Sequence, residues 1–350
     1  MFYALKFPGL ADPSATLIIM TGICTRHEPG ESLPPLLRVS GGPPLDRGRQ
    51  NQSNPFMQFA MIVNPHAGKK QGDKVSSEAA EWLASRGHDL TVLRSSMPGE
   101  TVSLARNLNL EGLDGIIAVG GDGTMFEVIN GLLLDRDEIP VPVGQIPVGT
   151  GNSFLKDVEL HSVEEALKAI DGGHSREVDL GWFHCGQGDY YFINLLGCGF
   201  VSNVAYRAKK YKFLGSLSYI LAVLEELVVL KSIPLELTID GRLYRRNAVF
   251  TEVCNSRFTG GDMLMAPQGS IDDGLLDVVV LSKITRRNLL RLFPAIFKGK
   301  HVEDPSVEVF KGREIEIKTA KPLLLTPDGE TFGTTPLSVK ALNRKIRIFC

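Results

Sequence analysis

The sequence predicts an α/β domain built around a parallel sheet, followed by a second, mainly antiparallel β-rich domain. Two observations support this fold class. From Met57 to about residue 177, apolar strands alternate with amphipathic helices, which is the pattern of βαβ units. From Val178 to Cys350, strand-like segments follow one another with turn signals between them, which indicates antiparallel pairing. The expected domains are therefore 57–177 and 178–350.

Within the first domain, short apolar segments alternate with segments whose apolar residues recur at helical spacing. The expected strands are 57–64, 88–95, 113–120 and 141–149, and the expected helices are 72–87, 99–108 and 124–133. In the second domain the expected strands are 177–186, 189–197, 234–241, 242–256, 275–282, 307–319, 321–330 and 345–350, and the expected helices are 213–232 and 285–300. Ligands of parallel sheets bind at the carboxyl ends of the strands, so the turns that follow the first-domain strands are the candidate site.

The composition is that of an ordinary globular protein. The 350 residues carry a formal net charge of -2, with 22% charged and 43% hydrophobic residues, which argues against a nucleic-acid partner. The five cysteines are scattered and lack metal-ligand spacing, which favours a reducing compartment and hence a cytoplasmic location. Residues 1–56 are rich in Gly, Pro, Arg and Ser and lack periodicity, so we interpret them as a flexible tail or a misplaced translation start.

One glycine-rich turn stands between a buried strand and an amphipathic helix. Its residues are Gly120, Gly121, Asp122, Gly123 and Thr124. Such a turn exposes backbone N–H groups at a helix N-terminus, and glycine lets an anion approach without a clash with Cβ. Phosphate is the expected ligand. The alternative is a tight turn that needs glycine only for its dihedral angles, and Asp122 and Thr124 favour the phosphate site.

Two further turns follow neighbouring strands of the same sheet. The turn after the strand 57–64 contains Asn64, Pro65, Gly68 and Lys69, and the turn at the end of the strand 141–149 contains Gly149, Thr150, Gly151 and Asn152. A solvated basic turn also explains Lys69 and its neighbour Lys70, but three such turns along one sheet edge favour a nucleotide site. Neither a G-x-G-x-x-G after the first strand nor a Walker-type loop occurs, so a different nucleotide-binding fold is indicated.

These motifs together resemble the diacylglycerol kinase catalytic-domain family, especially its bacterial lipid kinases, with sphingosine and ceramide kinases as relatives. The resemblance rests on VNPHAGKKQG, GGDGTMFEVINGL, PVGTGNSF, FTGGDMLMAPQGSIDDGLLDVVVL and a late PDGE, which occur in the family's order from Met57 to the C-terminus. NAD kinases and phosphofructokinases share the GGDGT element, so that element alone is not specific.

The resemblance implies that ATP lies between the two domains, with its phosphates against the three turns, and that Asp122 helps to hold the Mg²⁺ of the nucleotide. It also implies that Asp328 is the general base and that Glu330 is a neighbouring carboxylate that supports the metal or orients the base. Such a base accepts the proton of a lipid hydroxyl that attacks the γ-phosphoryl group. Without the resemblance, Pro327, Asp328 and Gly329 indicate a surface β-turn.

A second, structural Mg²⁺ site at Asp273 is also implied by the resemblance, with Asp272 and Asp277 as outer partners. Oxygen ligands suit a hard cation. A loop that faces water is the common alternative for clustered acids.

Two departures from the family pattern leave the acceptor open. Ser153 follows Asn152 where many diacylglycerol kinases have Asp, and Pro327 precedes Asp328. The leading expectation is an ATP-dependent lipid kinase that converts diacylglycerol to phosphatidic acid or acts on a related lipid. A kinase of sphingoid lipids, NAD or another soluble polyol is the rival of the same class. A non-catalytic nucleotide- or lipid-binding regulator is the rival of another class.

The expected partners are the lipid substrate and, by reversible peripheral contact, the inner membrane surface, while assembly into a homo-oligomer stays open. The helix 213–232 would line a lipid pocket or touch the membrane, although plain core is the commoner explanation for its apolar stripe. Lys209, Lys210 and Lys212 would contact anionic headgroups, with a solvated helix face as the alternative.

Overall fold

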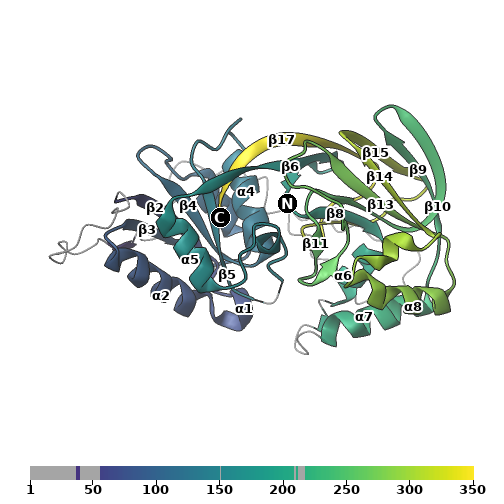
Figure 1. The fold of residues 1–350 in the computed structure, drawn as a ribbon, viewed down its shortest axis with the longest axis horizontal. Helices are drawn as coiled ribbons and strands as arrows, with labels where there is room; N and C mark the ends of the chain where they lie inside the picture. Colours follow the sequence, from purple (N-terminus) through teal and green to yellow (C-terminus); the bar gives the residue numbers. More distant parts are fainter. Residues whose placement is uncertain (1–36, 40–55, 150, 209, 212–216) are drawn as a thin grey trace, which may run out of the picture.

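The computed structural model describes residues 37–39, 56–149, 151–208, 210–211 and 217–350. It confirms the predicted fold class, with parallel strands in the N-terminal part and a mainly antiparallel C-terminal part (Figure 1). Most of the segment interpreted as a tail lies outside the described residues. Leu37–Val39, however, form β1 and pair antiparallel with β3, so these three residues are part of the fold rather than of a tail. Among the described helices, none has the length and apolarity needed to cross a bilayer.

The N-terminal part is a mainly parallel sheet, with β1 as its antiparallel edge strand, and it has helices on both faces. In order across the sheet, its parallel strands are β3 (Asp89–Arg94), β2 (Gln58–Val63), β4 (Gly115–Gly120) and β5 (Val143–Pro147). Its helices are α1 (Ala67–Lys70), α2 (Gly72–Ser85), α3 (Glu100–Arg106), α4 (Asp122–Leu133), η1 (Phe154–Lys156) and α5 (Val163–Gly172). Because β2, β4 and β5 are neighbours and parallel, the three turns predicted as the candidate site leave the sheet at one edge.

In its described residues, the C-terminal part contains most of the remaining strands and three α-helices. Its strands are β6 (Ser175–Cys185), β7 (Gly188–Phe192), β8 (Leu195–Gly199), β9 (Ile233–Ile239), β10 (Arg242–Cys254), β11 (Phe258–Thr259), β12 (Met263–Leu264), β13 (Leu276–Ser282), β14 (Val307–Gly312), β15 (Glu314–Thr319), β16 (Leu325–Pro327) and β17 (Leu337–Phe349). Its helices are α6 (Phe200–Ala208), α7 (Leu217–Val228), α8 (Arg286–Ile296) and the short η3 (Lys300–Glu303). The helices α6, α7 and α8 lie together beside the strands, at the end of the molecule away from α2 (Figure 1).

The last strand, β17, joins the two parts into one sheet. It arches between them, pairing antiparallel with β6 and β15 and, through Ile348 opposite Val143, parallel with β5 (Figure 1). Phe349 at its end is buried, and its ring centroid lies 6.1 Å from that of Phe59 in the N-terminal core. The chain end therefore packs with the first domain, while the division at residue 177 stays a prediction.

The predicted strand 189–197 is interrupted. It forms β7 and β8, and between them Ile193 and Asn194 leave the ladder. Their backbone N–H groups, together with that of Leu195, donate to the side chain of Asp328. This break therefore positions the late acidic residue.

Candidate functional site

A cavity of about 840 Å³ lies between the N-terminal and C-terminal parts. The N-terminal part contributes Asn64, His66, Ala67, Gly68, Lys69, Ser95, Met97, Pro98, Gly99, Thr101, Gly121, Gly123, Thr124, Glu127 and Val148. The C-terminal part contributes Leu195, Val201, Ala205, Ala208, Glu252, Thr259, Gly260, Thr326, Gly329 and Glu330. The cavity thus has a glycine-rich side with backbone N–H groups and a side that is partly apolar and partly acidic.

The three predicted turns meet beside this cavity. Asn64 donates from Nδ2 to Oγ1 of Thr124 at 3.3 Å, which joins the first turn to the second. Gly68 has φ +55°, and a Cβ built on it would lie 2.7 Å from Val148 just before the third turn. Thr150 lies outside the described residues. The other described turn residues do not line the cavity: they are Pro65, Gly120, Asp122, Gly149, Gly151 and Asn152.

Asp122 begins α4, and its carboxylate turns toward the third turn. Its oxygens lie 2.9 and 3.0 Å from the backbone nitrogen of Ser153, which donates to them. Burial raises the pKa of Asp122, and the hydrogen bonds from Ser153, Phe154 and Asn194 oppose that rise. Ser153 Oγ also accepts from the backbone N–H of Gly261 at 3.1 Å. The departure at Ser153 therefore supports Asp122 and links the two parts of the protein.

Asp328 is buried beneath the cavity rather than lining it. Its side chain is 6% exposed, and its φ of +46° is one of the few left-handed values among the described non-glycine residues. Oδ1 accepts the N–H groups of Asn194 and Leu195, and Oδ2 accepts that of Ile193 at 2.9 Å. Burial raises the pKa of Asp328 to about 7, and the charge of Asp122 adds to the rise while the three N–H groups oppose it.

The PDGE segment is a β-turn, as its sequence predicts, but it is not a surface turn. Glu330 donates its backbone N–H to the carbonyl of Pro327 at 2.7 Å. Gly329 and Glu330 line the cavity while Asp328 points inward. The turn thus presents one carboxylate to the cavity and holds the other in the protein.

Asn194 was not predicted, yet it connects the two aspartates. Its side chain hydrogen-bonds to Asp122, and its backbone N–H donates to Asp328 at 2.8 Å. Ser256 in turn donates to its Oδ1 at 3.2 Å. The signal in the sequence was a polar residue inside the apolar run YYFINLLG, where a buried side chain requires hydrogen-bond partners.

Glu330 and Glu127 face the cavity from opposite domains. The side chain of Glu330 lies over the first turn of α4, where a Cβ on Gly123 would be 2.6 Å from Oε1. Burial raises the pKa of Glu127, and the charge of Glu330 raises it further, against a hydrogen bond from Thr101. The two acids therefore give this cavity wall negative charge, although the described residues contain no cluster of three or more acids, histidines or cysteines that would hold a metal ion by itself.

Asp273 lies in a different place, on the loop before β13. Lys311 places its Nζ 3.4 Å from Asp273 Oδ2, 3.5 Å from Asp277 Oδ2 and 3.3 Å from the carbonyl of Gln268. An ammonium group therefore already neutralises the oxygen cluster that the sequence predicted as a structural Mg²⁺ site. Asp272 pairs instead with Arg176 at 2.7 Å. The metal role of Asp273 stays a prediction that Lys311 makes testable.

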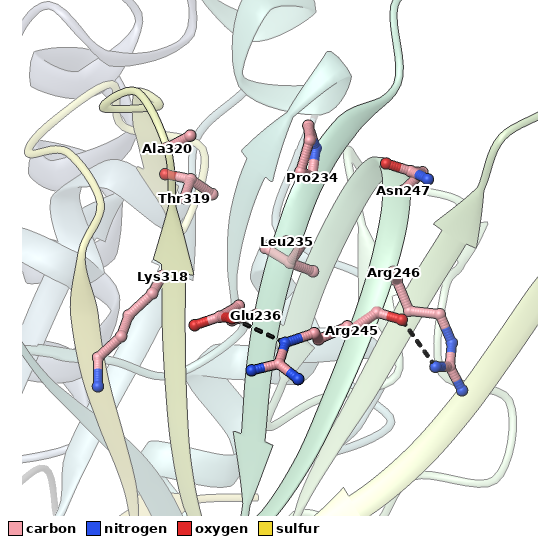
Figure 2. A pocket seen from close by; sticks show the side chains of 9 residues that line it. All are labelled: Pro234, Leu235, Glu236, Arg245, Arg246, Asn247, Lys318, Thr319 and Ala320. Atoms are coloured by element: carbon pink, nitrogen blue, oxygen red, sulfur yellow. Dashed lines mark hydrogen bonds and ion pairs between the residues drawn. The ribbon is translucent and has the colours of Figure 1, made fainter.

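A second hollow of about 580 Å³ lies on the outer strands of the C-terminal part (Figure 2). It is lined from β9, β10 and β15, and Arg245 donates to Glu236 at 2.9 Å within it. None of the residues predicted for the site lines it. The cavity between the two parts is the candidate active site.

Comparison with known proteins matches both parts of the chain to described domain families. Residues 58–183 match the family model described as the diacylglycerol kinase catalytic domain, and residues 194–350 match the YegS C-terminal NAD kinase beta sandwich-like domain. A diacylglycerol kinase of Bacillus subtilis (strain 168) is 30% identical over 293 residues, which cover 82% of this chain and 94% of that one. A diacylglycerol kinase of Staphylococcus aureus (strain MRSA252) is 29% identical over 292 residues, which cover 83% and 91%.

A solved structure has a similar fold. The crystal structure of a candidate diacylglycerol kinase from Bacillus anthracis str. Sterne superposes with a TM-score of 0.71 at 29% identity, covering 84% of this chain and 97% of that one. The two matched domains and the cavity between them define the class of a two-domain lipid kinase. The chain belongs to the diacylglycerol kinase family, and it is a kinase.

Proposed function

We propose that this kinase transfers the γ-phosphoryl group of ATP to the hydroxyl of a lipid, with diacylglycerol as the acceptor and phosphatidic acid as the product. One observation carries the proposal. A single cavity joins glycine-rich turns at a helix N-terminus with carboxylates and with an apolar side formed by Leu195 and α6. Phosphates require the glycine-rich turns, a metal requires carboxylates such as Glu330, and an acyl chain requires the apolar side.

The glycine-rich side of the cavity fits phosphate because its glycines have no side chains that would keep a ligand away from the backbone N–H groups. Gly121 and Gly123 lie at the N-terminus of α4, whose first-turn N–H groups favour an anion. A Cβ on Gly121 would have only Val148 O at 3.7 Å and Asn152 Oδ1 at 3.8 Å near it, so the space beside this turn is open for a ligand. Lys69 lines the same side and supplies positive charge.

Glu330, which lines the cavity, would hold Mg²⁺ with the help of Asp122, whose carboxylate lies behind the glycine-rich turn. A bound Mg²⁺ would offset negative charge on the transferred group. Asp328 does not itself line the cavity, but it is next to Gly329 of the cavity wall, so in this proposal its side chain accepts the proton of the attacking hydroxyl through one water. A carboxyl with a pKa of about 7 suits this role, because it is partly ionised near neutral pH yet holds a proton well. Oδ2 accepts one N–H group, so it retains capacity for a proton.

The membrane contact is proposed at α7 and α8. Their exposed apolar side chains are Leu221, Leu224, Val228, Leu290 and, just after α8, Phe297. Arg286 of α8 ties the two helices by donating to the carbonyls of Leu227 and Val228. Apolar side chains beside Arg287 and Arg291 fit an anionic bilayer, and such contact would make a cytoplasmic protein reversibly membrane-associated.

The decisive experiment offers the purified protein Mg²⁺ and labelled ATP with diacylglycerol, monoacylglycerol, sphingosine, ceramide, phosphatidylglycerol and NAD in parallel. We expect label in phosphatidic acid. Label in sphingosine, ceramide or NAD would move the protein to the rival kinases. No transfer to any acceptor, with ATP still bound in calorimetry, would support a non-catalytic regulator.

A further inference from the structure

Glu252 is a buried acid in the cavity that neither the phosphate turns nor the proposed base accounts for. It lies on β10, a strand with neighbours on both sides, and it is 4% exposed. Its Oε2 has no hydrogen-bond partner among the described residues. An unpaired polar atom of this kind costs free energy, so its presence in a cavity wall points to a ligand.

Thr326 shares this property and lies on the same face of the sheet. Gly197 of β8 is directly opposite Glu252 on one side and directly opposite Thr326 of β16 on the other. Side chains directly opposite one another in antiparallel pairs point to the same face. Thr326 is 6% exposed, lines the cavity, and its Oγ1 also has no hydrogen-bond partner in the described part of the chain.

Gly197 keeps the space between the two side chains open. A Cβ there would lie 2.8 Å from Val201 Cγ2 and 3.4 Å from Oε1 of Glu252. The bare backbone therefore lets the carboxyl group lie across the strand, between Thr326 and the first turn of α6. The neighbouring cavity residues Leu195, Val201, Ala205 and Ala208 are apolar.

The charge state of Glu252 indicates what kind of ligand fits. Burial alone raises its pKa to about 8, so the side chain is mostly protonated at neutral pH. A neutral carboxyl group donates one hydrogen bond and accepts others, and the Thr326 hydroxyl does the same. This pair matches an uncharged group that carries both a hydroxyl and a carbonyl.

We propose that Glu252 and Thr326 bind the uncharged glycerol-ester part of the acceptor lipid and thereby select a diacylglycerol-type acceptor over an amine-bearing sphingoid base. The inference rests on the proposed lipid kinase function and names the residues that give its acceptor site specificity. An amine would instead need Glu252 ionised, at the cost of charging a buried group.

The test compares three variants with one control. Glu252→Leu and Thr326→Val remove the polar groups with little change in volume, and Glu252→Gln keeps a neutral donor and acceptor. Thr251→Val is the control, because Thr251 lies on the opposite face of β10, is equally buried and does not line the cavity, while its Oγ1 also finds no partner within the described segments. The measurements are KM for dispersed dioctanoylglycerol, KM for ATP, and the thermal shift caused by dioctanoylglycerol without nucleotide.

We expect the KM for dioctanoylglycerol to rise about tenfold in Glu252→Leu and Thr326→Val, as for the loss of one hydrogen bond, with the KM for ATP unchanged. Glu252→Gln should raise it by only about threefold, and Thr251→Val should match the parent protein. The thermal shift should weaken in the same order.

An equal KM for dioctanoylglycerol in parent, Glu252→Leu and Thr326→Val would overturn the inference while leaving the kinase proposal intact. A loss in Glu252→Gln as large as in Glu252→Leu, with sphingosine as the preferred acceptor, would also overturn it in favour of an amine ligand. Absence of transfer by the parent would refute the kinase proposal, and the nucleotide-free thermal shift would then still decide whether these residues bind the lipid.

Discussion

The side chain of Glu330 lies over Gly123, so closely that a Cβ on Gly123 would be 2.6 Å from Oε1. Gly123 belongs to the first turn of α4 and Glu330 to the late PDGE turn, more than 200 residues further along the chain. The acidic group of the C-terminal part thus meets the helix N-terminus of the N-terminal part at the cavity. Substitutions at this junction should separate nucleotide binding from folding.

Gly121→Ala should weaken ATP binding without loss of fold. Within the protein the nearest atom to the new Cβ is 3.7 Å away, so the turn can accept it, but the methyl group would fill space beside the N-terminus of α4. We expect about tenfold weaker ATP affinity in calorimetry with an unchanged melting temperature. Gly186→Ala is the control, because a Cβ there meets nothing within 4 Å. ATP affinity equal to the parent protein would exclude this turn as the phosphate site.

Asp122→Asn should impair the use of Mg²⁺ and ATP. The change keeps size and one acceptor oxygen for the Ser153 backbone N–H but removes the charge that a metal needs. We expect turnover to fall at limiting Mg²⁺ more than at saturating Mg²⁺, with an intact fold. The matched control is Asp135→Asn, since that exposed carboxylate pairs with Arg106 at the surface. Equal rates for Asp122→Asn and the parent at both Mg²⁺ concentrations would refute a metal role.

Asp328→Asn should remove the dependence of turnover on pH that the titration of Asp328 causes. A base with a pKa of about 7 is mostly protonated at pH 6, so parent turnover should rise about tenfold per pH unit below 7 and level off above it. In the variant, turnover should fall about 10²- to 10⁴-fold and lose this rise, while ATP still binds. A variant that is slow but keeps the same pH profile would show instead that Asp328 only positions Ile193, Asn194 and Leu195.

Lys311→Met should reveal whether Asp273 belongs to a metal site. In the parent, the ammonium group lies between Asp273 and Asp277, so we expect Mg²⁺ to change its melting temperature little. In the variant, two carboxylates lose their cation, the melting temperature should fall by a few degrees, and Mg²⁺ should restore it.

The control for Lys311→Met is Lys318→Met, because the Lys318 side chain is 61% exposed and pairs with Glu316 on the surface. If Mg²⁺ raises the melting temperature of the parent and Asp273→Asn abolishes that rise, the sequence-based prediction of a structural Mg²⁺ site holds and Lys311 is a neighbour only.

Local patterns in the sequence were sufficient for the parallel sheet and its turns. The strand-turn-helix segment around Asp122 has all its signals within about 20 residues: buried apolar residues, then glycines, then helical periodicity. The structure accordingly places β4 and α4 where they were expected, with α4 beginning two residues earlier, at Asp122 instead of Thr124.

Features that depend on distant contacts could not be predicted in this way. The break between β7 and β8 exists because three backbone N–H groups bind Asp328, which lies more than 130 residues away. Glu252 sits in an ordinary strand pattern, and only its register with Gly197 and Thr326 shows that it reaches the cavity. β17 looks like a second-domain strand, yet Phe349 packs in the first. The helices α5 and α6 were also not predicted.

Glu252→Gln should alter how stability depends on pH. In the folded protein the pKa of Glu252 is about 8, against an ordinary value of 4.5, so the folded state holds a proton that the unfolded state has released between these two values. Stability from this group is therefore fully present below about pH 4.5 and is lost as the pH rises toward 8, at up to roughly 1.4 kcal/mol per pH unit. Glutamine keeps the shape and does not titrate.

Thermal melts of the parent and variant at pH 5, 6, 7 and 8.5 should show the variant gaining relative stability at each step. The pKa of Asp328 is raised as well, but this shift is the same in the parent and the variant. It therefore cancels when the stabilities of the two proteins are subtracted. Glu164→Gln, on the exposed face of α5, should show no such gain. A constant difference between Glu252→Gln and the parent across this range would mean that Glu252 is ionised throughout, and the neutral acceptor site built on it would then fail as well.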